Sequence, residues 1–117
     1  MQPYGCLIIQ MTMDAVFRAL ADPVRRRLLD RLRERGGQSL GELSREEAMT
    51  RQAVTKHLAI LEAANLVAVR REGRLRLHYL NPVPIQEIAD RWIGAFDRQR
   101  LRALADLKHA VEALPDA

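Results

Sequence analysis

The sequence predicts a mainly α-helical domain that carries one small β-hairpin. Apolar residues recur every three or four positions up to Leu66 and again beyond Pro84, which is the period of an amphipathic helix. Between Val67 and Tyr79 the period changes to two, with Glu72-Gly73 as a turn between two short runs. In these runs Val67, Val69, Leu75, Leu77 and Tyr79 alternate with Ala68, Arg70, Arg74, Arg76 and His78. The length of 117 residues, with 48% hydrophobic and 29% charged residues, fits one folded domain. We place it at residues 12–114, after an extension at residues 1–11 that either packs or is loose.

The first two helices are defined by a strong start signal at Asp22-Pro23. Residues 12–21 form a short helix, and Asp22 then supplies an N-cap with proline at the first helical position. The second helix runs to about residue 35, where Gly36-Gly37 ends it. Its apolar residues, which we expect to face inward, are Val24, Leu28, Leu29 and Leu32. Its arginines, which we expect on or near the exposed side, are Arg25, Arg26, Arg27 and Arg31.

The third and fourth helices form a helix-turn-helix. Ser39 and Glu42 match a capping box, which begins a short helix that buries Leu40 and Leu43. The turn contains Ala48 where such turns often have glycine. The fourth helix has Thr50 as N-cap and ends at Asn65. Its inward residues are Val54, Leu58 and Leu61.

The outer surface of the fourth helix is polar and suited to nucleic acid. Arginine and lysine bind phosphates or guanine, glutamine pairs with adenine, and threonine contacts hydrogen-bonding groups or a thymine methyl. We therefore interpret this segment as a recognition helix that enters the major groove of DNA. The residues expected to contact DNA are Thr50, Arg51, Gln52, Thr55, Lys56 and His57.

The hairpin that follows is rich in arginine. Residues 50–80 hold six lysines and arginines against two glutamates, which accounts for the whole net charge of +4. Such a concentrated basic patch is typical of nucleic-acid binders. One interpretation is a solvated hairpin whose cations protect a strand edge. We favour a wing that lies along the DNA backbone through Arg70, Arg71, Arg74 and Arg76, with His78 covering backbone or meeting phosphate.

The chain closes with an apolar stripe on one long helix that begins near Pro84 and runs for roughly 28 residues, well beyond the globular mean. A small domain cannot cover such a stripe alone, so we expect a two-fold dimer through the terminal helices, with Trp92 and Phe96 as anchors. The alternative is that this helix lies across its own domain. The residues expected at the dimer interface are Val16, Phe17, Leu20, Ile88, Trp92 and Phe96.

Two segments and the order of elements resemble the ArsR/SmtB family of winged helix-turn-helix repressors. The segments are residues 17–29, with their Ala-Asp-Pro-x-Arg turn, and residues 52–61, with x-Lys-His-Leu-x-x-Leu. The resemblance covers about residues 13–107 and extends to Gly73-Arg74 in the wing. It implies a homodimer that binds an inverted-repeat operator in double-stranded DNA and blocks transcription, with Arg74 as the phosphate contact of the wing. Recognition helices would stand one DNA turn apart, on the order of 34 Å.

The sequence departs from the metal-sensing members of that family. No Cys-x-Cys occurs at residues 40–44, and the closing helix offers only Asp97, Asp106, His109 and Glu112, which at such spacing usually form a solvated surface. Four imidazole, thiolate or carboxylate ligands are the norm for zinc. We therefore expect no metal and no other cofactor, and the inducing ligand stays undefined.

Other functions receive less support. Neither His57 nor His78 has a nucleophile partner, and no Gly-rich phosphate loop is present, so we do not expect an enzyme. No apolar run reaches the length of about 18 residues for a membrane span, and the single Cys6 fits a reducing cytoplasm. Cys6 is either a redox switch or an inert tail thiol. The two rival functions are a winged module that docks an acidic protein, and a metal or thiol sensor with an unrecognised site.

Overall fold

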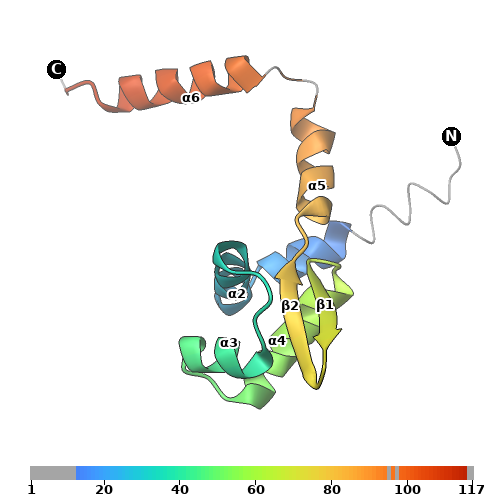
Figure 1. Cartoon of the computed structure of the whole chain (residues 1–117). Coiled ribbons are helices and arrows are strands. Elements are labelled where there is room, and N and C mark those ends of the chain that lie inside the picture. The colour runs from blue at the N-terminus through green and yellow to red at the C-terminus, as the bar shows by residue number, and fades with distance from the viewer. Residues whose placement is uncertain (1–12, 95, 97, 116–117) are drawn as a thin grey trace, which may run out of the picture. The chain divides into compact units, whose positions relative to one another are not determined.

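The computed structural model describes residues 13–94, 96 and 98–115. A helix at residues 13–20 is followed by α2 (Pro23–Glu34), α3 (Leu40–Glu47) and α4 (Arg51–Ala63). Strands β1 (Val67–Glu72) and β2 (Leu75–Leu80) form the hairpin, and α5 (Val83–Ile93) and α6 (Arg98–Glu112) complete the chain (Figure 1). The order confirms the predicted winged helix-turn-helix. The chain forms two compact units that divide between Gln86 and Glu87.

The three predicted helix starts are confirmed by their hydrogen bonds. Asp22 Oδ1 accepts from the backbone N–H of Val24 at 2.8 Å, and Pro23 takes the first helical position of α2. Ser39 Oγ accepts from the N–H of Glu42 at 3.3 Å, and Thr50 Oγ1 accepts from that of Ala53 at 3.2 Å. Each cap satisfies a backbone donor that has no partner within its helix.

Left-handed residues end α3 and α4. Ala48, with φ 53°, ends α3, and the N–H of Met49 reaches back to the carbonyl of Ser44 at 3.1 Å. Asn65, with φ 61°, ends α4, where the N–H of Leu66 reaches the carbonyl of Leu61 at 2.9 Å. Both are Schellman-type endings, which normally use glycine or asparagine at the left-handed position. Alanine at 48 therefore makes the bend between α3 and α4 under local backbone strain.

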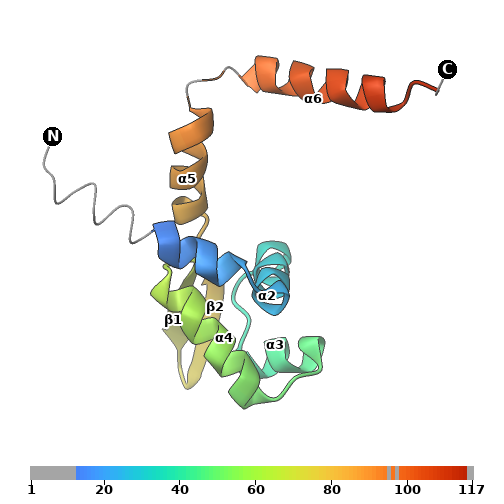
Figure 2. The ribbon, with the colours of Figure 1, turned by 180° about the vertical axis from the view of Figure 1, so that it is seen from behind.

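The core of the first unit is formed by buried apolar residues of the helix at residues 13–20, of α2, α3 and α4, and of the start of β1. The inward residues predicted for α4 are all buried, and Leu43 of α3 is buried beside them. Figure 2 shows α4 alongside the hairpin, in agreement with the contacts between α4 and β1. In both views the first turn of α4 and the tip of the hairpin lie toward the same end of this unit. The core residues with the largest fully buried side chains are Val16, Leu28, Leu43, Val54, Leu61 and Leu66.

The strand register corrects the alternation expected for β2. Val69 pairs with His78, and Val67 with Leu80, so these side chains share one face of the hairpin. His78 is 5% exposed, and its Nδ1 lies 2.9 Å from the carbonyl oxygen of Gln38. Leu75 and Leu77 lie on the opposite face, although the sequence pattern places them with Val67 and Val69. A bridge between residues 38 and 78 sets the inward face, and the local pattern cannot reveal it.

The predicted closing helix is interrupted. Helix α5 ends at Ile93 and α6 begins at Arg98, so the single helix of roughly 28 residues expected from its period is wrong. A Cβ at Gly94 would lie 2.6 Å from the carbonyl oxygen of Asp90, so the backbone there accepts glycine alone without adjustment. The N–H of Phe96 then bonds to the carbonyl of Ile93 at 2.8 Å, in a tighter turn. Glycine, which has a low helix propensity, therefore stands where α5 ends.

Candidate nucleic-acid interface

The outer face of α4 presents the polar residues predicted to meet DNA. Arg51, Gln52, Thr55 and Lys56 are exposed, as is the cap residue Thr50, whereas His57 is half-buried. The alanines of this helix have small side chains, which allow another molecule to approach the helix backbone closely. The exposed surface of α4 therefore has the groups that read base edges in the major groove.

Two residues on this face already have defined neighbours. Thr55 Oγ1 donates to the carbonyl of Arg51 at 2.7 Å, so the hydroxyl hydrogen is used within the helix and the oxygen can still accept. The Arg51 guanidinium extends back over Gly41 of α3, where a Cβ would lie 3.1 Å from its Nη2. Arg51 is thus directed toward the border between α3 and α4.

Arg25 orients His57, a role that the sequence pattern of α2 does not indicate. Arg25 Nε donates to the carbonyl of Ala19 at 2.8 Å, and its Nη2 donates to that of Arg18 at 2.9 Å. Its Nη1 lies 3.4 Å from His57 Nδ1. Because a guanidinium only donates, this contact suits the neutral His57 tautomer in which Nδ1 accepts and Nε2 carries the proton.

Asp22 begins the helix that carries Arg25. The backbone N–H of Arg25 hydrogen-bonds this carboxylate and, despite some desolvation, holds the pKa of Asp22 below 3.8, with help from the N–H of Val24. The carboxylate also lies 3.9 Å from the Arg25 guanidinium. Asp22 and Arg25 therefore form a chain of contacts that ends at the His57 imidazole.

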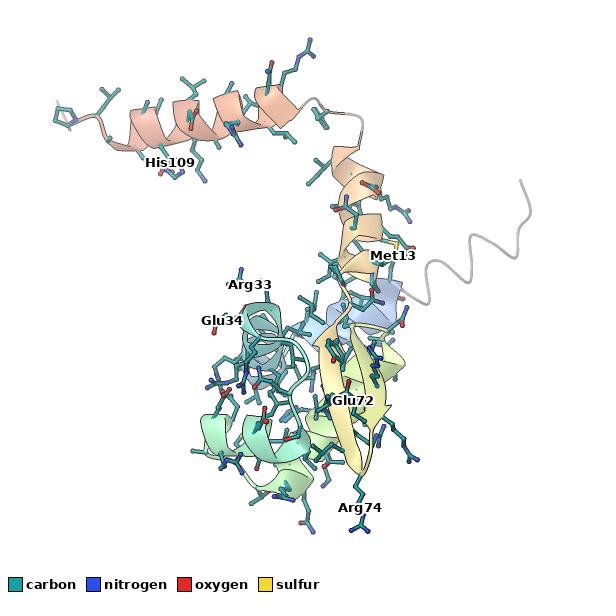
Figure 3. The ribbon with its side chains drawn as sticks, in the orientation of Figure 1. Met13, Arg33, Glu34, Glu72, Arg74 and His109 are labelled. Atoms are coloured by element: carbon teal, nitrogen blue, oxygen red, sulfur yellow. The ribbon has the colours of Figure 1, made fainter. Side chains whose placement is uncertain are left out.

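The four wing arginines do not share one surface. Arg71 pairs with Arg76 across the strands, on the face that carries His78 further along. Arg70 pairs with Leu77 and lies on the opposite face. Arg74 projects from the tip of the hairpin, where Gly73 has φ +61° (Figure 3). The structure therefore groups Arg71 and Arg76 on the α4 side and separates Arg70 from them.

Arg76 already has a partner on α4. Its Nη2 lies 3.5 Å from Glu62 Oε1, and the Arg76 side chain remains 58% exposed. The pair stands at the rim of a cavity of about 240 Å³ between α4 and β2, which Leu40, Leu58 and His78 also line. Part of the positive charge predicted for the wing is therefore neutralised within the protein.

A buried carboxylate fixes α3, and with it the start of α4, against α2. Glu47, with a side chain 2% exposed, accepts from Arg27 Nε at 2.9 Å and from Arg31 Nε at 2.7 Å. Burial alone would raise the pKa of Glu47, but the hydrogen bonds and charges of these arginines outweigh it and hold the pKa below 4.5. The same contact raises the pKa of Arg31. The sequence pattern, by contrast, places both arginines on the exposed side of α2.

The residues predicted for the dimer interface fall into both units. Val16 is 1% exposed and belongs to the core of its own unit, so it offers no surface to a partner. Phe17 is exposed and Leu20 half-buried. In the second unit Ile88 is half-buried, whereas Trp92 and Phe96 are 56% and 55% exposed. The apolar residues that α6 exposes, with the tail beyond it, are Leu104, Leu107, Val111 and Leu114.

The structure bears on the metal and membrane predictions only for the residues that it describes. Across residues 13–94, 96 and 98–115, no three histidine, cysteine, aspartate or glutamate side chains cluster in a way that could hold a metal ion. Of the residues weighed for such a site, His109 lies 4.0 Å from Glu112 on α6. Cys6, Asp97 and the extension at residues 1–11 lie outside the described residues. None of the helices described combines the length and apolar character that a bilayer crossing requires.

Comparison with known proteins agrees with this geometry. A helix-turn-helix domain model matches residues 20–70. The chain is 41% identical over 86 residues to the HTH-type transcriptional regulator YuzN of Bacillus subtilis, covering 68% of this chain and 94% of YuzN. It is 31% identical over 75 residues to the transcriptional repressor SdpR of the same species, covering 64% and 82%. Among solved structures, an ArsR-like transcriptional regulator from Rhodococcus sp. RHA1 is 30% identical with a TM-score of 0.66, covering 90% of this chain and 94% of that one. The chain therefore belongs to the ArsR family of winged helix-turn-helix proteins and is a DNA-binding transcriptional regulator.

Proposed function

We propose that the protein is a homodimeric repressor that binds an inverted-repeat operator, without a metal or other cofactor and without enzymatic activity. The main support is that the first turn of α4, where Arg51 and Gln52 are exposed, and the wing tip bearing Arg74 lie toward one end of the same folded unit (Figures 1 and 3). SdpR, to which the chain is similar, is named a transcriptional repressor. A repressor of this kind acts where the chromosome is accessible, which in a bacterial cell is the cytoplasm.

In this proposal the DNA contacts divide into two kinds. Gln52, Thr55 and His57 meet base edges in the major groove, with His57 donating from Nε2. Arg74 meets the backbone, with Lys56 at the border. Base contacts set the sequence preference, whereas phosphate contacts add affinity for every duplex and make binding salt-dependent.

The test measures DNA binding of two variants by fluorescence anisotropy. One duplex comes from the promoter region of the protein's own gene (the promoter duplex), and the other is a scrambled duplex of equal length. Arg74→Ala should weaken binding to both duplexes by a similar factor and reduce the salt slope by about 0.9 for each phosphate that Arg74 neutralises. Gln52→Ala should mainly reduce the preference for the promoter, by about 1–3 kcal/mol per base contact. Arg33→Ala removes the same charge at the far end of the unit from Arg74 and is the control (Figure 3). Identical behaviour of the first two variants would contradict this division of roles.

The dimer requires its own measurement. Exposed aromatic side chains such as Trp92 and Phe96 are what a subunit interface buries at its centre. Trp92→Glu should shift sedimentation toward the monomer and weaken operator binding, because one protomer then contacts only one half-site. Leu75→Glu places the same charge on an exposed leucine of the wing and should leave the oligomeric state unchanged. A wild-type protein that sediments as a monomer at all concentrations would refute the dimer.

A further inference from the structure

Helix α3 separates its charges onto two sides. Its three glutamates all pair with arginines of α2 or with Arg35, the residue that follows α2. Glu42 pairs with Arg35 at 2.9 Å, Glu46 with Arg31 at 3.3 Å, and Glu47 with both Arg27 and Arg31. The one arginine of this helix, Arg45, is exposed and lies on the same helix face as Gly41. Within the part of the chain that the structure describes, no carboxylate pairs with Arg45.

The guanidinium of Arg51, at the start of α4, also lies beside Gly41. A Cβ built on Gly41 would lie 3.1 Å from Arg51 Nη2 and 3.7 Å from Arg45 Nη1, so both guanidiniums stand within 4 Å of one point. No ion pair with a described residue neutralises Arg51 either. Two guanidiniums from consecutive helices are therefore gathered beside a residue that has no side chain of its own.

Such an arrangement is unfavourable unless an anion joins it. Like charges in close proximity repel, and the arginines that contact the glutamates of α3 each have a carboxylate that offsets this cost. Guanidinium groups present several donors in a plane and match the oxygens of a phosphate in bidentate fashion. Gly41 leaves the backbone bare at this point, which gives an anion access between the two side chains.

We propose that Arg45 and Arg51 together hold one phosphate of the DNA backbone at the junction of α3 and α4. The inference rests on the proposed function and adds Arg45, which the sequence pattern does not single out, to the DNA-binding residues. It also assigns Arg51 to the backbone, whereas the sequence leaves it divided between base and phosphate. The first helix of a helix-turn-helix crosses the backbone while the second enters the groove, and a clamp at their junction sets how deep α4 is inserted.

The experiment measures binding of the full-length protein to the promoter duplex and to the scrambled duplex across a range of salt. Arg45→Ala should weaken both by the same factor, on the order of threefold to tenfold near 100 mM salt. It should also make the salt slope of the dimer shallower, by less than the value of about 1.8 (about 0.9 for each protomer) that complete loss of the phosphate contact would give, because Arg51 stays at the phosphate. Arg45→Lys keeps the charge and should retain most of the slope. Arg33→Ala, which removes an exposed arginine of α2, should change neither quantity.

The outcomes separate this clamp from the function on which it rests. Because Arg45 is exposed and unpaired among the described residues, its removal should not lower the thermal midpoint, and that measurement excludes misfolding. If wild type binds DNA while Arg45→Ala matches Arg33→Ala in affinity and slope, the clamp is refuted and DNA binding stands. A change in sequence preference without a change in slope would also refute it, since Arg45 would then read a base. If wild type binds neither duplex, the proposed function itself fails.

Discussion

Ala48→Gly should stabilise the protein, although most substitutions by glycine do the opposite. Ala48 has φ 53° and ψ 42°, and its side chain is exposed, so the methyl group strains the backbone without contributing to packing. The left-handed conformation costs a residue with a Cβ about 1–2 kcal/mol relative to glycine. Glycine gives up about 0.4–1 kcal/mol more backbone entropy on folding. The net gain should be about 0.5–1 kcal/mol, which corresponds to a rise in Tm of about 2–5 °C.

The matched control is Ala59→Gly, since Ala59 is also exposed but lies inside α4. Glycine there should cost about 1 kcal/mol, because no strain is relieved in a helix interior. Thermal and urea unfolding of both variants would show shifts of opposite sign. DNA affinity of Ala48→Gly should be retained, because the bonds that orient α3 and α4 come from backbone groups that glycine also has. If both variants are destabilised to the same extent, the strain that we assign to Ala48 is absent.

Two further substitutions test the charged contacts. Glu47→Gln should lower the free energy of unfolding by about 1–2 kcal/mol at pH 7, less than for a fully buried pair because Arg27 and Arg31 remain partly in water. Folding lowers the pKa of Glu47, so its stabilising contribution is present above pH 4.5 and is lost as the pH falls through the folded pKa. The difference in unfolding free energy between wild type and Glu47→Gln, measured in urea, should therefore shrink in acid. A difference that does not change with pH would contradict the assignment. Glu62→Gln should tighten binding to any duplex by about twofold to fivefold and steepen the salt slope, because it releases Arg76 from its ion pair and adds positive charge to the DNA-facing side. Anisotropy titrations that show weaker binding for this variant would place Glu62 in the positioning of the wing instead.

The helix boundaries could be predicted because their causes are local. Asp22, Ser39 and Thr50 each cap a helix through a bond to a backbone N–H two or three residues ahead, so both partners lie within one short segment. Asn65 ends α4 for an equally local reason, since asparagine tolerates the left-handed conformation. The same reasoning identifies Ala48 as an unusual turn residue, and the structure shows the strain that follows.

The roles of Arg25 and Glu47 depend on partners that are distant in the sequence. The helical pattern groups Arg25 with three other arginines on a solvated face, yet Arg25 contacts His57 thirty-two residues away. Glu47 is buried only because Arg27 and Arg31 of α2 reach it. An amphipathic pattern says which side of a helix faces the core, but it does not say which charged residues at the border find each other across it.

The hairpin shows that contacts between residues distant in the sequence also decide which charges the wing exposes. Both alternations of β2 contain apolar residues, Leu75 and Leu77 in one and Leu80 in the other, so composition alone cannot choose the inward face. The choice is made by His78, whose backbone and ring both bond to the carbonyl of Gln38, a residue that precedes α3. A shift of one residue in this register would move Arg76 away from Glu62 and turn it to the outer face. The distribution of positive charge on the wing is therefore decided by the bridge between Gln38 and His78, a residue two positions along β2 from Arg76.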